Sequence, residues 1–85
     1  DLAATVAGLL PAMIMNNGQA CVAQTRVLAS RRRYREVAEA LAAALGALLV
    51  GDPADPSTMV GPLVSERQRA RVESYLRLGR EEGAR

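Results

Sequence analysis

The sequence predicts an α/β chain in the order helix, loop, strand, helix, loop, helix. Apolar residues recur at three- and four-residue intervals in three stretches, and a cluster of turn residues precedes a short apolar run at 26–29. With 85 residues, the chain is one small domain at most. A chain of this length buries only about 60–65% of the surface that its unfolded form exposes, so we expect marginal stability in isolation.

A first helix is expected over residues 2–15. Asp1 precedes it in the N-cap position, and one face carries an apolar stripe of Val6, Leu9, Leu10, Met13 and Ile14. Pro11 lies inside this helix, where it removes the hydrogen bond to residue 7. A kink or an early end is therefore predicted.

A tight turn follows the first helix, because Asn16, Asn17 and Gly18 all tolerate left-handed backbone conformations. Cys21 lies just past that turn. The run Arg26 to Ala29 is predicted to be a short strand.

A second helix is expected to begin after Ser30 as its N-cap, with apolar positions at Tyr34, Val37, Leu41, Leu45 and Leu48. Residues 50–62 contain three of the four prolines and have no periodicity, which indicates a loop or a linker. A third helix should begin at Ser65, which forms a capping box with Gln68. Its inner face would carry Val72, Tyr75, Leu76 and Gly79.

Composition excludes several classes of function. The chain has no histidine and a single cysteine, so it offers no internal Cys/His pair, disulfide or metal-ligand cluster, and no metal is expected. No membrane span is expected, since the least charged stretch, 2–25, is interrupted by polar residues and proline. The start lacks the basic region of a signal peptide, so a cytoplasmic location is predicted.

The charged residues have simpler interpretations than binding or catalysis. Net charge is only +2, and Glu36 and Glu39 follow closely on the arginine cluster at 31–35, so no nucleic-acid partner is expected. Asp52 and Asp55 lie between prolines, where turn formation is the favoured role. Glu66 and Glu73 are interpreted as charges on a helix surface.

Cys21 admits two interpretations. A free cysteine commonly behaves as a small buried hydrophobic residue. Here, however, Gly18 and Gln19 place it after a turn rather than in an apolar stripe. Backbone amides at a turn or helix start can stabilise both a thiolate and the oxyanion formed after its attack.

Residues 16–26 read Asn-Asn-Gly-Gln-Ala-Cys-Val-Ala-Gln-Thr-Arg, and this segment resembles the active-site segment of the aldehyde dehydrogenase superfamily, Asn-x-Gly-Gln-x-Cys followed by Thr/Ser-Arg. A second, independent stretch is similar to the loop and helix that follow the active-site strand in that family. It comprises Gly51-Asp52-Pro53, Asp55-Pro56, Thr58, Gly61-Pro62-Leu63-Val64-Ser65, Gln68, Val72, Tyr75 and Glu82-Gly83-Ala84. The chain departs from the family at Ile14 and Met15, where aromatic residues are common, and at Pro11.

The resemblance implies a role for each residue around the cysteine. Cys21 would be the catalytic thiolate that attacks an aldehyde, forming a thiohemiacetal that is oxidised by NAD or NADP to a thioester. Hydrolysis or acyl transfer would then end the cycle. The backbone amide of Cys21 would form half of the oxyanion hole. Ala20 and Val22 would border the substrate pocket.

The resemblance also implies that residues 1–85 are a partial catalytic domain of Rossmann-like α/β architecture without its cofactor-binding region. The family's general-base glutamate, oxyanion-hole asparagine and glycine-rich cofactor region have no counterpart here, and no Gly-x-Gly-x-x-Gly occurs. No bound cofactor is therefore expected on this chain alone. The expected partners are an aldehyde and the remainder of the fold, in a homo-oligomeric complete enzyme. The alternative is a truncated, non-catalytic remnant or an interaction fragment.

Overall fold

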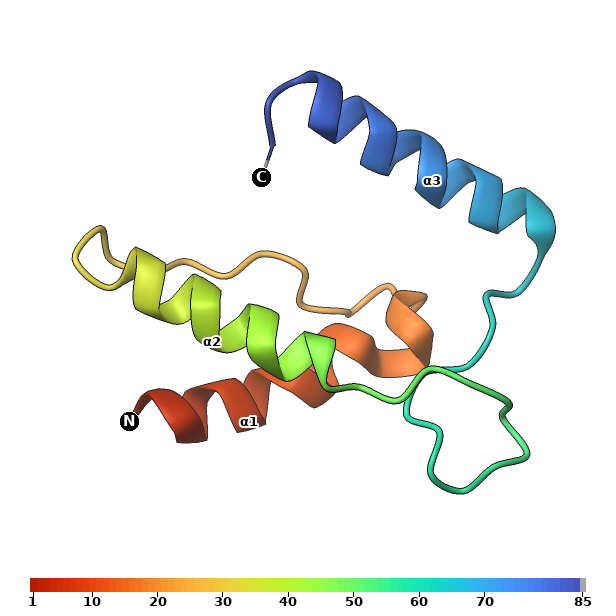
Figure 1. The fold of residues 1–85 in the computed structure, drawn as a ribbon, viewed down its shortest axis with the longest axis horizontal. Helices are drawn as coiled ribbons and strands as arrows, with labels where there is room; N and C mark the ends of the chain where they lie inside the picture. Colours follow the sequence, from red (N-terminus) through yellow and green to blue (C-terminus); the bar gives the residue numbers. More distant parts are fainter. Residues whose placement is uncertain (85) are drawn as a thin grey trace.

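The computed structural model describes residues 1–84 as three α-helices and one short 3-10 helix joined by irregular segments. In chain order these are α1 (Leu2–Ile14), η1 (Met15–Gly18), α2 (Tyr34–Gly46) and α3 (Glu66–Glu81). Helices α1 and α2 pack against each other, whereas α3 contacts neither of them and stands apart (Figure 1). No helix in the described part of the chain has the length and apolar character needed to cross a membrane.

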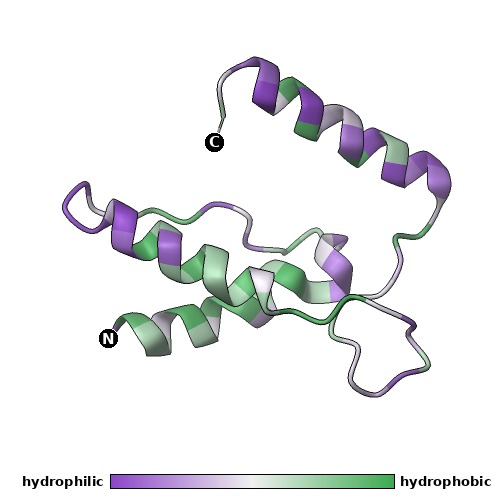
Figure 2. Ribbon diagram, in the orientation of Figure 1, coloured by the Kyte–Doolittle hydropathy of each residue, from purple (hydrophilic) through white to green (hydrophobic). Residues whose placement is uncertain are grey.

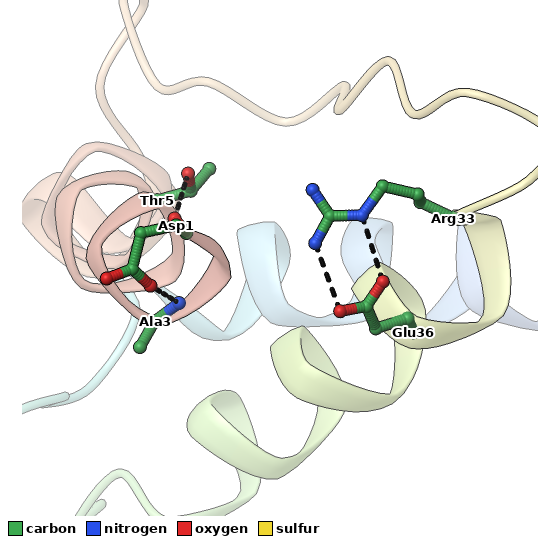
Figure 3. Close-up of polar contacts among 5 residues, drawn as sticks. All are labelled: Asp1, Ala3, Thr5, Arg33 and Glu36. Carbon is green, nitrogen blue, oxygen red and sulfur yellow. Dashed lines mark hydrogen bonds and ion pairs between the residues drawn. The ribbon is translucent and has the colours of Figure 1, made fainter.

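Helix α1 confirms the first predicted helix to within one residue. The Asp1 carboxylate caps it, because Oδ1 accepts a hydrogen bond from the backbone N–H of Ala3 at 2.9 Å (Figure 3). It also accepts one from the Ala4 N–H at 3.5 Å. A kink or an early end was predicted at Pro11; the early end is wrong, since the helix continues to Ile14. Proline removes one backbone bond, but packing of the helix supplies most of its stability, and α1 packs against α2.

The strand predicted over 26–29 is not confirmed, because residues 1–84 contain only a single isolated parallel bridge, between Val50 and Val60. The exposure of successive side chains in this segment nevertheless alternates as it does in a strand. Val27 and Ala29 are half-buried and line a hollow with Val37 and Leu41 of α2, whereas Leu28 between them is 90% exposed. The segment has the side-chain pattern of a strand but no neighbouring strand with which to form a ladder.

Helix α2 begins later than predicted. Ser30 was expected as its N-cap, but residues 31–33 form a turn in which the Arg33 N–H donates to the Ser30 carbonyl at 2.9 Å. The helix therefore starts at Tyr34 with Arg33 as N-cap, and the Arg33 guanidinium binds the Glu36 carboxylate through two bonds of 2.9 and 3.0 Å (Figure 3). Leu48 lies beyond the end of the helix at Gly46.

Helix α3 confirms the third predicted helix and its cap, because the Ser65 hydroxyl accepts a hydrogen bond from the Gln68 N–H at 3.2 Å. Its predicted inner face is bare: Val72, Tyr75 and Leu76 are 40%, 61% and 56% exposed. In Figure 2 the helix alternates apolar and polar bands with no other helix covering them. The apolar stripe is therefore present without a surface to pack on.

None of the residues that the structure describes is fully buried. The chain exposes 7127 Å², whereas a compact monomer of this mass exposes about 4,900 Å² and its unfolded chain about 13,000 Å². Only about 45% of the surface is thus buried, less than the expected 60–65%. The radius of gyration is 14.3 Å, against about 12 Å for a compact chain of this length. The open arrangement explains both differences.

We predict that the isolated 85-residue chain self-associates or remains loosely packed, because Leu28, Val22 and the α3 face present apolar surface to water. Sedimentation velocity should show concentration-dependent association, and a dye specific for apolar surface should bind. A sharp, cooperative thermal transition from a monodisperse monomer that binds no dye would contradict the prediction.

Candidate functional site

The turn before the cysteine consists of three successive residues in the left-handed region. Asn16 has φ 50° and ψ 46°, Asn17 has φ 57° and ψ 33°, and Gly18 has φ 75°. Glycine adopts this conformation freely, whereas each left-handed non-glycine residue costs about 1–3 kcal/mol, least for asparagine. The turn closes with a bond of 3.0 Å from the Gln19 N–H to the Asn16 carbonyl. The sequence prediction of a tight left-handed turn is confirmed.

Cys21 lies in a second turn, directly after the first, and its side chain is exposed. The Ala23 N–H donates to the Ala20 carbonyl at 3.0 Å, which places Cys21 and Val22 at the two central positions. The next residue, Gln24, donates its N–H at 3.1 Å to the carbonyl of Ala12. That carbonyl belongs to the last turn of α1, where carbonyls lack partners within the helix.

The side chains of Asn17 and Gln19 bridge this turn to residues more than 40 positions later. Asn17 Oδ1 accepts from the Gly61 N–H at 2.9 Å, and Asn17 Nδ2 donates to the Pro62 carbonyl at 3.1 Å. Gln19 Oε1 accepts from the Val64 N–H at 2.9 Å, while its Nε2 donates to the Asn16 carbonyl at 3.1 Å. The two sequence motifs that resemble the aldehyde dehydrogenase superfamily are thus joined directly by hydrogen bonds.

A hollow of about 370 Å³ lies between the turn and the start of α3. It is lined by Asn17, Gly18, Gln19, Leu63, Val64, Gln68 and Val72. Cys21, Ala20 and Val22 do not line it; Val22 is 65% exposed and Ala20 is half-buried. The predicted site residues therefore lie together in one turn, outside this hollow.

The loop between α2 and α3 is an ordered element. Its ends meet where the Gly51 N–H donates to the Val60 carbonyl at 3.1 Å and the Leu49 carbonyl accepts from the N–H groups of Met59 and Val60. Asp52 and Asp55 form turns, as predicted: Asp52 Oδ1 accepts from the Ala54 N–H at 2.8 Å.

Asp55 makes the same kind of turn with Ser57. Its Oδ1 accepts the Ser57 N–H at 2.8 Å and the Ser57 hydroxyl at 2.7 Å. These bonds favour the charged carboxylate and lower the pKa of Asp55, the backbone N–H having the larger effect.

Several other charged side chains form exposed pairs on the helix surfaces, as predicted for Glu66 and Glu73. Both carboxylates lie near Arg69, at 3.9 Å and 2.9 Å. The hydrogen bond with Glu73 raises the pKa of Arg69, and the bond with Arg33 lowers the pKa of Glu36. Exposed pairs of this kind contribute little to stability.

The bridging role of Asn17 and Gln19 was not anticipated from the sequence. Both were interpreted only as turn residues, because a bond to a residue 44 or 45 positions away has no local pattern. The available signal was the pair of motifs itself. Both segments resemble the same family, but this resemblance does not say which of their atoms meet.

The pattern of the aldehyde dehydrogenase family matches residues 1–85. The geranial dehydrogenase of Castellaniella defragrans is 46% identical over 79 residues, which are 93% of this chain and 16% of that protein. The NADP-dependent succinate-semialdehyde dehydrogenase of Mycobacterium leprae is 45% identical over 76 residues, 89% of this chain and 17% of the relative. The chain therefore spans about a sixth of the length of these relatives.

Solved structures show the same likeness. A Mycobacterium tuberculosis aldehyde dehydrogenase complexed with NAD+ matches this chain with a TM-score of 0.96 and 52% identity. The match covers 100% of this chain and 18% of the M. tuberculosis chain. An aldehyde dehydrogenase of Bacillus cereus matches 98% of this chain and 17% of its own, with a TM-score of 0.90 and 35% identity. The open arrangement of residues 1–84 is thus similar to one segment of much larger enzymes.

We predict that the Asp55 carboxyl titrates below the ordinary value of about 3.9, because the Ser57 N–H and hydroxyl bind its charged form. A lowered folded pKa stabilises the turn above the ordinary pKa, and this contribution is lost as pH falls through the lowered value. Carboxyl chemical shifts followed during acid titration should show this. Ser57→Ala should raise the midpoint part of the way, since the backbone bond remains. An unchanged midpoint in Ser57→Ala would contradict the assignment.

Proposed function

The chain belongs to the aldehyde dehydrogenase family, and from this premise we propose that residues 1–85 are the nucleophile-bearing part of a catalytic domain that oxidises aldehydes to carboxylic acids. The observation that carries the proposal is the position of Cys21, which is exposed at the centre of a turn. Directly before this turn lies the strained left-handed turn that is bonded to residues 61–64. Strained backbone of this kind concentrates at functional sites.

The chemistry assigned to Cys21 is nucleophilic attack. Its Sγ, as the thiolate, forms a C–S bond to the aldehyde carbon, and the carbonyl oxygen gains a proton to give a thiohemiacetal. NAD or NADP, bound by parts of the enzyme outside these residues, supplies the two-electron oxidation to the thioester. Water or another acyl acceptor then adds to the thioester carbon, the C–S bond breaks and the thiol is restored.

The backbone N–H of Cys21 is proposed as one donor to the oxyanion. In the part of the chain that the structure describes, this N–H donates no hydrogen bond, although the turn that contains Cys21 is closed by the bond from Ala23 to Ala20. A donor held in place by a turn and free of another acceptor can bind a developing oxyanion without reorganisation.

Ala20 and Val22 are proposed to border the aldehyde pocket, since they flank Cys21 in the same turn. Their side chains are small, and Val22 is 65% exposed, so each is available to contact a substrate or the remainder of the domain. One side of the pocket is then formed by this chain and the opposite side by residues outside it.

The Rossmann-like α/β architecture is proposed for the completed domain. The alternation of half-buried Val27, exposed Leu28 and half-buried Ala29 supports a strand that pairs with a strand from elsewhere in the longer enzyme. A parallel strand is covered on both faces, which would also bury Leu28.

A second interpretation, a non-catalytic fragment, is favoured by the absence of any fully buried residue within 1–84. A chain without a core does not hold catalytic groups in place by itself. The two interpretations differ in whether the remainder of the enzyme is supplied, in the same polypeptide or by a partner.

We predict that the isolated chain does not oxidise aldehydes, because no general base is assigned beside Cys21 and no residue is assigned to the cofactor. Formation of reduced nicotinamide with a panel of aldehydes should stay at the level of a protein-free control. Turnover that survives further purification and is lost in Cys21→Ala would contradict this prediction.

A separate prediction concerns the completed enzyme. We use this name for the longer protein that carries residues 1–85, or for the M. tuberculosis enzyme with its matching segment replaced by them, a substitution supported by the TM-score of 0.96. Cys21→Ala should abolish oxidation, and Cys21→Ser should be nearly as damaging, because a hydroxyl is far less nucleophilic than a partly ionised thiol.

Steady-state kinetics measure this loss, and thermal melting verifies that the variants remain folded. Iodoacetamide should label Cys21, and bound aldehyde should protect it. If Cys21→Ala retained more than about a tenth of the rate, a barrier change below about 1.4 kcal/mol, the assignment of the nucleophile would fall.

A further inference from the structure

We propose that the side-chain amides of Asn17 and Gln19 are positioning residues for Cys21, acting together as an amide clamp that fastens the left-handed turn to residues 61–64. The proposal rests on the proposed function, since it concerns the aim of the nucleophile. Neither side chain is assigned a contact with substrate or cofactor. Each acts through the backbone that leads to Cys21.

The contacts of the clamp use both ends of each amide. Asn17 accepts from the Gly61 N–H at 2.9 Å and donates to the Pro62 carbonyl at 3.1 Å. Gln19 accepts from the Val64 N–H at 2.9 Å and donates to the Asn16 carbonyl at 3.1 Å. Asn17 therefore joins the turn to the distant segment at two points. Gln19 adds a third point and also braces the turn internally.

The clamp explains how an unfavourable turn persists. Asn16, Asn17 and Gly18 are left-handed in succession, and strained backbone persists only where surrounding contacts over-determine it. Here no packed core supplies those contacts, because Asn17 and Gln19 are only half-buried. Side-chain hydrogen bonds to 61–64 are what hold the conformation.

The clamp also lies immediately before the nucleophile. Gln19 closes the first turn, and the second turn, with Cys21 at its centre, begins at Ala20. On the other side, the Gln24 N–H is tied to Ala12 of α1. Cys21 is thus held between two anchors, and release of the first would let the sulfur move. A misplacement of about 1 Å can lower a rate about 100-fold.

An amide is the side chain that these partners require. Oδ1 of Asn17 faces an N–H donor and Nδ2 faces a carbonyl acceptor, one residue apart. A carboxylate in this position would keep the bond from the Gly61 N–H but would place negative charge against the Pro62 carbonyl oxygen. An apolar side chain would lose both bonds.

The test compares Asn17→Gly and Gln19→Met with two matched controls in the completed enzyme. Glycine at 17 keeps the left-handed conformation accessible, so its effect reports the lost amide rather than added strain. Methionine at 19 preserves length and unbranched shape. Gln24→Met is the control for loss of an amide, because its side chain makes no hydrogen bond within residues 1–84. Gly61→Ala is the control for a change in the segment that the clamp binds. It keeps the N–H that donates to Asn17, and the added Cβ would meet Asn17 Nδ2 at an ordinary 3.7 Å.

Three quantities are measured for each variant: kcat and KM for an aldehyde, the dissociation constant for NAD+ or NADP+, and the rate at which iodoacetamide labels Cys21. We expect Asn17→Gly and Gln19→Met to lower kcat about 10- to 100-fold and to change the labelling rate. Cofactor affinity and the melting temperature should stay near those of the controls. Gln19→Glu, which keeps the acceptor for Val64, should recover part of the activity lost in Gln19→Met.

Unchanged kcat and labelling in both clamp variants would overturn the proposal. A parallel fall of kcat, cofactor affinity and melting temperature would also overturn it, because it would indicate a merely structural role. Cys21→Ala, assayed alongside, separates this proposal from the proposed function. If that variant remained active while the clamp variants still altered labelling of Cys21, the clamp would stand and the nucleophile assignment would fall.

Discussion

The hydrogen bonds from Asn17 and Gln19 to residues 61–64 determine how the two halves of the chain are arranged. Helix α3 packs against neither α1 nor α2, so its position follows from the segment that leads into it. That segment is joined at one end to the 49–51 stretch after α2 and at the other to the turn before Cys21. A few polar contacts therefore hold these elements in their relative positions, as a hydrophobic core does in a compact domain.

The exposed apolar surface and the exposed cysteine have a common origin. Leu28 is 90% exposed and Tyr75 61%, values that suit side chains whose packing partners belong to other elements. Cys21 is exposed for the same reason, because no element within residues 1–84 covers the turn that carries it. Residues 1–84 leave these side chains uncovered, in agreement with the likeness to about a sixth of a larger enzyme.

The sequence predicted those features that are encoded locally. The caps at Asp1 and Ser65 and the left-handed turn depend on neighbouring residues, and the structure confirms them. The strand at 26–29 was not formed, because a strand needs a partner that this segment lacks within residues 1–84. The start of α2 was misplaced by three residues, since Ser30 accepts a turn bond instead of capping the helix. The roles of Cys21, Ala20 and Val22 stay predictions.

The same distinction bears on catalysis. The local sequence predicts that Cys21 follows a turn, but that turn is also bonded to residues 44 and 45 positions away. Motifs read from sequence identify which groups take part; they carry no information on what holds those groups. In this chain the holding contacts are polar and half-exposed rather than buried. The geometry of the turn before Cys21 is therefore set by a small number of hydrogen bonds, and each of them can be removed by changing one side chain.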